Sequence, residues 1–434
     1  MKGITMKLTQ EEQEILEGRQ GLTLQKVMRT LVLYGEALSA KRFVDIEWQG
    51  HFSIPFALPG VGPRLEMLDE LAEVGLKTKY PFTLDPKAPL DFENLFLNKE
   101  QEQVFKEMFR NQQAYDRRML QLGLRNEEAY TCTPYLPEVG NIPPKSTILA
   151  WSESSCVVYA NSVLGARTNR NAAIMDILSN IAGKTPLAGL LTDEGRRALW
   201  RVKVNTSQMP NPQLLGAAIG MKVLEDVPYI VGLDRFLETE INESTRDYLK
   251  EMGAACAAIG AVGLYHVENI TPEAIDHGSD LLTPDHKTYH IDDKELRRLM
   301  DSYPLMWADK GAKPEKCFIG CPHLSLRELR WWAVNIIERL EAHHKDHLAV
   351  NTVLCAAPQV LKKFKADNEN YERLKSAGVR LTGTCPEAYM DNQLCALDAV
   401  ITNSNKLRAF TTARMFLDED LLEVIVTGEI GEEG

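Results

Sequence analysis

The stretch KCFIGCPHLSLRELRWWAVNIIERLE, residues 316–341, decides the fold class. It opens with a short apolar run at 316–320, which predicts a buried strand. Ser325 and Glu328 follow at the spacing of a capping box, in which each side chain accepts a hydrogen bond from the other residue's backbone amide. A helix is therefore expected over 325–341. A buried strand followed by an amphipathic helix is the repeating unit of a parallel sheet covered by helices.

The same unit recurs through the last third of the chain. Further apolar runs lie at 348–355, 379–383, 399–402 and 422–426, and helical patterns separate most of them. We interpret each run as a strand and predict an α/β fold with mostly parallel sheets.

Two other stretches carry local structural information. The segment 80–94 contains three prolines and is expected to be an extended linker. Glycines set among alanines predict helices packed closely against strands, and they are Gly216, Gly220, Gly253, Gly260 and Gly263.

Reactive side chains directly follow several of the predicted strands. Ligands of open parallel sheets bind just beyond the carboxyl ends of the strands, so these side chains should meet at one edge. They are Cys321 and His323 after 316–320, Cys355 at the end of 348–355, Cys385 after 379–383, and Ser404 and Lys406 after 399–402.

A further cysteine, Cys132, lies in the turn-rich segment 130–135, where burial in a core is less natural. Three dispersed thiolates could hold an iron-sulfur cluster with one iron left open for substrate. An open metal site acts as a Lewis acid on a bound hydroxyl. Two alternatives stay open at this point, namely reduced cysteines with a structural role and a zinc site that combines thiolates with His323.

The segment 151–170 is the other concentration of polar groups. Arginine forks bind carboxylates and phosphates through two parallel charge-assisted bonds, so this segment is a candidate anion clamp. The alternative is a polar surface loop. The residues concerned are Glu153, Ser154, Ser155, Asn161, Ser162, Arg167, Thr168, Asn169 and Arg170.

Composition narrows the class of protein. With 434 residues, 44% hydrophobic and 25% charged, the chain is typical of a soluble globular protein with two or three lobes. A net charge of −12 without a basic stripe argues against a nucleic-acid partner. The first thirteen residues lack the apolar core of a signal peptide, and no apolar run is long enough to span a membrane. We therefore expect a cytoplasmic protein without a membrane partner, in which the eight cysteines are reduced.

Several of these segments resemble the aconitase X family of the aconitase superfamily. The most specific one runs from Glu153 to Arg170, and the others are 130–135, 264–268, 320–323, 384–385 and 402–406. They occur in family order over nearly the whole chain.

The resemblance implies one catalytic domain over 1–434 with a three-layered α/β fold, for which we expect lobes at 1–205 and 206–434. It also implies an iron-sulfur cluster on Cys132, Cys321 and Cys385. Family members dehydrate small hydroxylated acids such as mevalonate 5-phosphate or cis-3-hydroxy-L-proline. A smaller swivelling domain, fused in some members and a separate subunit in others, is the expected partner and could carry a serine base.

One residue and two segments differ from the family pattern, and these differences bear on which substrate the enzyme uses. Cys156 stands where many relatives carry a small residue. The segment 50–55 only loosely resembles the family's substrate-side histidine and serine region. Residues 171–173 replace a Glu-Gly-Gly-like turn.

The sequence therefore predicts a metal-assisted hydro-lyase. Its predicted catalytic residues are Glu153, Ser154, Ser155, His323, Ser404 and Lys406. A nucleotide-dependent oxidoreductase is an alternative, but the sequence lacks the glycine-rich motif that binds dinucleotides. An iron-responsive RNA-binding regulator is a second alternative, against which the acidic charge argues.

Overall fold

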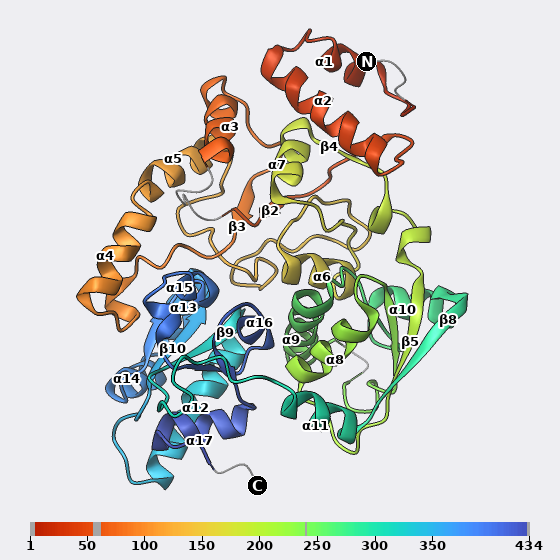
Figure 1. Cartoon of the computed structure of the whole chain (residues 1–434). Coiled ribbons are helices and arrows are strands. Elements are labelled where there is room, and N and C mark those ends of the chain that lie inside the picture. Colours follow the sequence, from red (N-terminus) through yellow and green to blue (C-terminus); the bar gives the residue numbers. More distant parts are fainter. Residues whose placement is uncertain (1–4, 55–61, 239–240, 432–434) are drawn as a thin grey trace.

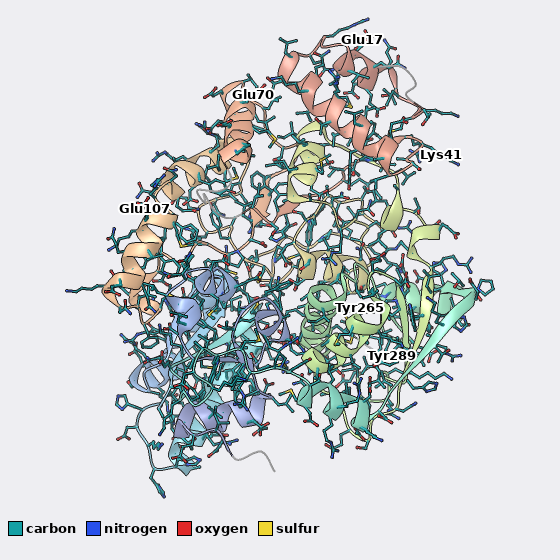
Figure 2. All side chains as sticks on the ribbon, viewed as in Figure 1. Glu17, Lys41, Glu70, Glu107, Tyr265 and Tyr289 are labelled. Carbon is teal, nitrogen blue, oxygen red and sulfur yellow. The ribbon has the colours of Figure 1, made fainter. Side chains whose placement is uncertain are left out.

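A computed structural model describes residues 5–54, 62–238 and 241–431. Two all-parallel sheets with flanking helices lie side by side beneath an N-terminal region of helices and short strands (Figure 1). The predicted α/β fold with mostly parallel sheets is confirmed. Charged residues such as Glu17, Lys41 and Glu107 project into solvent from the N-terminal region, whereas Tyr265 is buried (Figure 2).

The larger sheet is built by the last third of the chain. Its strand order is β11-β10-β9-β12-β13, and every neighbouring pair is parallel. The strands are β9 (Lys316–Leu324), β10 (Asn351–Ala356), β11 (Arg380–Thr382), β12 (Val400–Thr402) and β13 (Arg414–Met415). The helices are α12 (Leu326–Ala342), α13 (Pro358–Ala366), α14 (Asn368–Ser376), α15 (Pro386–Met390), α16 (Asn405–Phe410) and α17 (Asp418–Thr427). The predicted capping box is present at Ser325 and Glu328, at the start of α12.

One strand prediction in this region is wrong. Residues 422–426 belong to helix α17, which packs against α12. A short apolar run cannot by itself distinguish a buried strand from a buried helix face. Three acidic residues at 418–420, in the first turn, favour the helix because they oppose the positive end of its dipole.

The second sheet has the order β7-β6-β5-β8 and is also parallel throughout. Its strands are β5 (Ala198–Val204), β6 (Pro228–Val231), β7 (His266–Val267) and β8 (Leu282–Ile291). Its helices are α8 (Pro212–Val223), α9 (Glu243–Gly260), α10 (Pro272–His277) and α11 (Asp293–Asp301). Strand β5 ends just before the predicted lobe boundary at 205/206 but pairs with β6 and β8 beyond it.

Most of the glycines predicted to lie against strands instead join two helices. A Cβ on Gly220 would lie 2.9 Å from the carbonyl oxygen of Cys256, and a Cβ on Gly260 would lie 2.1 Å from that of Gly220. Glycine therefore allows the backbones of α8 and α9 to approach closely. The prediction of close packing is confirmed, but its partner at these positions is a helix.

The N-terminal region contains two small sheets. Strands β1 (Phe43–Asp45) and β4 (Lys184–Pro186) pair antiparallel, whereas β2 (Gly50–Phe52) and β3 (Phe82–Leu84) pair parallel. Strand β3 lies inside the segment expected to be a linker, so that expectation is only partly right. The helices are α1 (Gln10–Leu16), α2 (Leu22–Ala37), α3 (Gly62–Glu73), α4 (Lys99–Met108), α5 (Gln112–Leu122), α6 (Ser154–Ser162) and α7 (Ala173–Ala182).

Helix α6 lies where the three regions meet (Figure 1). It contacts α9, and α9 contacts α16 of the larger sheet. One hydrophobic core includes buried residues from α6 and from both large sheets. No helix among the described residues is both long and apolar enough to cross a membrane.

Candidate active site

The carboxyl ends of the larger sheet bring together the side chains that the sequence pointed to. Cys321 lies in β9 just after Gly320, Cys385 is the N-cap residue of α15, and Lys406 is in the first turn of α16. The thiols of Cys385 and Cys321 interact electrostatically, and Lys406 acts on both. The predicted convergence of these groups is present in the fold.

Cys132 joins this group from the N-terminal region. Its Sγ accepts a hydrogen bond from the backbone amide of His323 at 3.2 Å, and its thiol lies in the fields of Cys321 and Lys406. Burial raises the pKa of all three thiols, to about 12 for Cys321, while the Lys406 charge opposes the rise for each. A bound cation would therefore be needed to keep the three as thiolates.

The arrangement bears on the kind of metal site. Among the described residues, no group of three or more His, Cys, Asp and Glu side chains is close enough to hold one metal ion. An iron-sulfur cluster takes more widely spaced ligands, because each cysteine binds a different iron. His323 Nδ1 contacts the Thr131 hydroxyl at 3.1 Å, its buried Nε2 has no hydrogen-bond partner among the described residues, and burial lowers its pKa to about 3. Because no three ligands in the described part of the chain lie close enough for one ion, the three thiols beside one ammonium fit a cluster better than a zinc ion.

A buried ion pair lies beside the thiols. Lys406 Nζ is 2.8 Å from Oε1 of Glu153, and the two side chains are 14% and 3% exposed. Glu153 caps α6, and its Oε2 accepts hydrogen bonds from the Ser155 hydroxyl at 2.5 Å and the Cys156 amide at 2.7 Å. The Ser154 hydroxyl donates to Oε1 at 3.2 Å.

The pair keeps both of its charges despite burial. Burial alone would raise the pKa of Glu153, but Lys406 and the hydrogen-bond donors hold it well below its ordinary range. Burial alone would lower the pKa of Lys406, but Glu153 and Glu387 raise it well above its ordinary value. Glu153 is therefore an anion that orients a cation toward the thiols.

His51, from the segment 50–55 that loosely resembles the family's histidine and serine region, and Asp85, which the sequence did not point to, also face this region. Strands β2 and β3 end with Ser53 and Asp85 side by side, and the Ser53 hydroxyl donates to Asp85 Oδ2 at 2.7 Å. His51 Nε2 lies 3.4 Å from Asp85 Oδ1. Pro55, at the end of the segment that loosely resembles the family's histidine and serine region, lies outside the described residues.

A cluster of charged side chains around the buried Lys250 contacts the backbone of His323. Lys250 Nζ donates to the His323 carbonyl at 3.1 Å and lies 3.0 Å from Glu251, and it also pairs with Glu328. Burial raises the pKa of Glu251 to about 7, with Glu328 adding to the rise and Lys250 opposing it. Ser404 donates its hydroxyl hydrogen to the Cys321 carbonyl.

Most side chains of the predicted anion clamp are hydrogen-bonded to the protein's own backbone, and one arginine has few partners. Asn161 bonds the Thr168 backbone through both ends of its amide, and the Thr168 hydroxyl accepts from the Trp151 amide. The Ser162 hydroxyl accepts from the Tyr265 amide, and Asn169 bonds the backbone at 188 and 190. These contacts hold the segment 161–169 in place.

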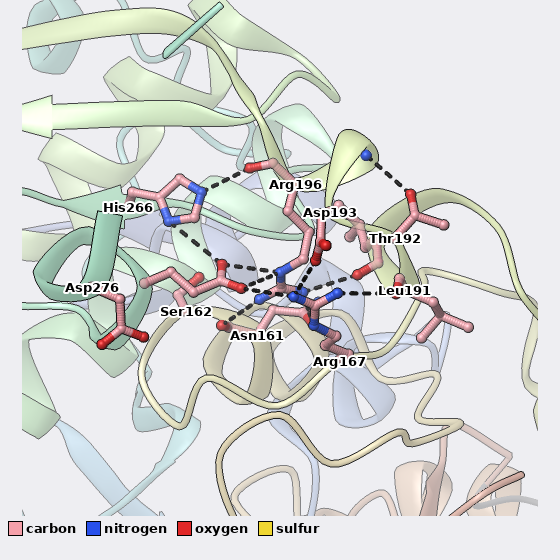
Figure 3. A network of polar contacts seen from close by, with 12 residues as sticks. Asn161, Ser162, Arg167, Leu191, Thr192, Asp193, Arg196, His266 and Asp276 are labelled. Atoms are coloured by element: carbon pink, nitrogen blue, oxygen red, sulfur yellow. Dashed lines mark hydrogen bonds and ion pairs between the residues drawn. The ribbon is translucent and has the colours of Figure 1, made fainter. Parts of the chain in front are cut away.

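The two arginines of the segment differ in their partners. Arg167 lies 2.6 Å from Asp193 and 3.7 Å from Glu273, within a network built around the buried Arg196 (Figure 3). Arg170 makes one long hydrogen bond, 3.4 Å, to the Ala257 carbonyl. Burial lowers the pKa of its guanidinium, and the negative charge of Glu153 partly opposes the effect.

Comparisons with known proteins match the chain to one family. Family models of aconitase X match the chain in three parts: the first domain at residues 5–194, the second at 197–301 and the third at 315–419.

Named relatives and one solved structure also match most of this chain. The phosphomevalonate dehydratase large subunit of Thermococcus kodakarensis is 35% identical over 75% of this chain and 76% of its own. That of Methanocaldococcus jannaschii is 28% identical over 98% and 99%. The cis-3-hydroxy-L-proline dehydratase of Pseudomonas aeruginosa is 28% identical over 86% and 61%. The crystal structure of holo-form aconitase X from Thermococcus kodakaraensis superposes with a TM-score of 0.79 at 28% identity, over 97% of this chain and 100% of that one.

Proposed function

Because the chain belongs to the aconitase X family, we propose that it is the large, catalytic subunit of a hydro-lyase that removes water from a small hydroxylated acid. Its named relatives are dehydratases of phosphomevalonate and of cis-3-hydroxy-L-proline. The observation that carries the proposal is the convergence of one buried and two partly buried cysteines with the Glu153–Lys406 pair.

Cys132, Cys321 and Cys385 are the proposed ligands of an iron-sulfur cluster. When bound, a cluster with one open iron position supplies a Lewis acid for the hydroxyl that leaves. The free thiols resist ionisation because they are buried, so a site that gathers three of them beside an ammonium is suited to a cationic cofactor.

The proposed catalytic side chains have distinct tasks. Lys406 binds a substrate carboxylate, and Glu153 orients the ammonium while Ser154 and Ser155 hold Glu153. His323 remains neutral and fixes the position of Cys132 through its backbone amide. Ser404 fixes the backbone of Cys321. These hydrogen bonds preorganise the site, so that little reorganisation is needed when charge develops in the reaction.

The segment 161–170 is the proposed site for the anionic end of the substrate. Arg170 is its contact with substrate, because its guanidinium has one weak hydrogen bond and lies in the field of Glu153. Arg167 supports the same segment and adds positive charge beside it. The side chains of Asn161, Ser162, Thr168 and Asn169 hold the backbone from which both arginines project.

A small swivelling subunit is the proposed partner. Relatives that match 75% and 98% of this chain are named large subunits, which implies a second, smaller chain in those enzymes. Closure of such a subunit over the thiols would exclude water and strengthen each charge interaction in the site. We propose that the complex acts in the cytoplasm, where the free cysteines stay reduced.

The test is reconstitution under anaerobic conditions. The chain is expressed with small proteins encoded nearby, the complex is isolated by size-exclusion chromatography, and dehydration of mevalonate 5-phosphate and of cis-3-hydroxy-L-proline is measured. Turnover by the complex and poor turnover by the isolated chain are expected. Full activity of the chain alone would contradict the proposed division of labour, and no turnover of any hydroxy acid by a cluster-loaded complex would contradict the function.

A further inference from the structure

Asp85 is held at one end of the site by two parallel strands. Phe52 and Leu84 are register partners, so the next residues, Ser53 and Asp85, leave β2 and β3 at the same edge. The Asp85 amide donates to the Phe52 carbonyl at 3.1 Å, and Ser53 donates to Oδ2. The carboxyl therefore has a fixed position and one satisfied oxygen.

The other oxygen, Oδ1, lies 3.4 Å from His51 Nε2, an ion-pair contact that lacks the alignment of a hydrogen bond. His51 is fully buried, and its Nδ1 contacts the Thr83 hydroxyl at 2.9 Å, which turns Nε2 toward Asp85. Among the described residues, neither His51 Nε2 nor Asp85 Oδ1 has a hydrogen-bond partner, although both atoms are buried. Buried polar atoms usually form well-aligned hydrogen bonds, so a loosely held acid–imidazole ion pair beside the thiols calls for a functional explanation.

The surrounding charges favour a proton on Asp85. The carboxyl shares its environment with His51 from β2, Glu153 and Cys156 at α6, Glu387 on α15 and Lys406 on α16. Burial raises the pKa of Asp85, and Glu153 raises it further, whereas His51 and Lys406 oppose the rise. Glu153 differs, because its ion pair keeps it ionised.

We propose that Asp85 is a further catalytic residue, the general acid that protonates the departing hydroxyl, and that His51 positions its carboxyl. The inference rests on the proposed hydro-lyase function. In the step, the carboxyl O–H bond breaks as the substrate C–O bond breaks, and the hydroxyl leaves as water. A general base takes the proton from the neighbouring carbon, and that C–H electron pair forms the new double bond. The Asp85 carboxylate regains its proton from solvent after the product has left.

The kinetic test compares Asp85→Asn and Asp85→Glu with the wild-type complex. The asparagine keeps the shape and the bond to Ser53 but has no proton to give. We expect a loss of kcat of about 10²–10⁴-fold with a much smaller change in KM. In the wild type, kcat should fall as the pH rises and the acid ionises, and this fall should be absent in Asp85→Asn. Asp85→Glu should recover part of the rate.

A matched control is Glu387→Gln, which removes a second buried carboxyl near Lys406 and should leave the high-pH fall in place. Unchanged kcat in Asp85→Asn, or a high-pH fall that disappears in Glu387→Gln instead, would overturn the proposal. A purely structural role would also overturn it, and would appear as lower stability with the pH profile intact.

A second readout does not need turnover. Infrared difference spectra of the cluster-loaded wild type and Asp85→Asn should contain the carbonyl band of a protonated carboxyl that the variant lacks. Its absence near neutral pH would refute the proposal even if the enzyme is a dehydratase. If the band is present but the wild type dehydrates no hydroxy acid, the proposed function fails, and with it the catalytic role of the proton.

Discussion

Replacing the buried partner of Lys406 should destabilise the protein far more than breaking an exposed ion pair. In Glu153→Gln the side chain keeps its size, but the Lys406 ammonium loses its counter-charge while only 14% exposed. Removing one partner of a buried pair costs about 3–5 kcal/mol of the free energy of unfolding, because the remaining charge is left uncompensated. Lys406→Met strands the Glu153 carboxylate in the same way and should have a similar effect.

The double variant Glu153→Gln with Lys406→Met separates this effect from ordinary damage to packing. Neither charge remains buried in the double variant, so its free energy of unfolding should fall by no more than that of one single variant. The departure from additivity, which is the coupling energy of the pair, should then be at least about 3 kcal/mol. Urea unfolding at equilibrium, followed by circular dichroism and by tryptophan fluorescence, gives the four free energies. The exposed pair Lys26–Glu70, whose side chains are 68% and 43% exposed, is the control and should show a loss of about 0–1 kcal/mol. Additive losses in the double variant would refute the buried ion pair as described.

Three further predictions follow from other contacts. Arg170→Lys should lower kcat/KM about 10- to 100-fold, because the substrate loses a planar fork, whereas Arg167→Lys should first lower thermal stability through its bond to Asp193. The pKa of Glu251 is about 7 in the folded protein and about 4.3 in the unfolded chain, so its contribution to the free energy of unfolding falls as the pH rises between these values. The free energy of unfolding of Glu251→Gln, measured against the wild type by denaturant titration, should therefore rise by about 2–4 kcal/mol between pH 4 and pH 7. Gly260→Ala should cost about 1–3 kcal/mol because its Cβ would meet the facing helix backbone, and a melting temperature equal to that of the wild type would contradict this.

Residues that follow apolar runs in a repeated strand–helix pattern could be predicted from the sequence. Cys321, Cys385 and Lys406 come directly after apolar runs of a parallel sheet, and the carboxyl ends of such strands share one edge. The position of Cys132 could not be predicted from the strand pattern, because it depends on a contact with the His323 amide, 191 residues away. The family resemblance named it, and the fold brings it beside Cys321.

Residues on strands outside that repeated pattern could not be found in this way. Strands β2 (GHF) and β3 (FTL) do not belong to the series of apolar runs in the last third of the chain, and the sequence places 29 residues between them. His51 and Asp85 therefore looked unrelated until the parallel pairing set them side by side. The clamp segment shows the converse case, since its composition indicated an anion site while most of its side chains are bonded to the backbone.

The most direct test of the central claim is the amount of iron and sulfide bound per chain after anaerobic purification. The wild type and Cys317→Ala should contain both, because Cys317 is a buried packing residue of the same strand as Cys321. Cys321→Ala should lose most of the iron and sulfide while its circular dichroism spectrum stays close to that of Cys317→Ala. A wild-type protein that binds zinc instead, or a Cys321→Ala variant with full iron and sulfide content, would contradict the proposed cluster and its ligands.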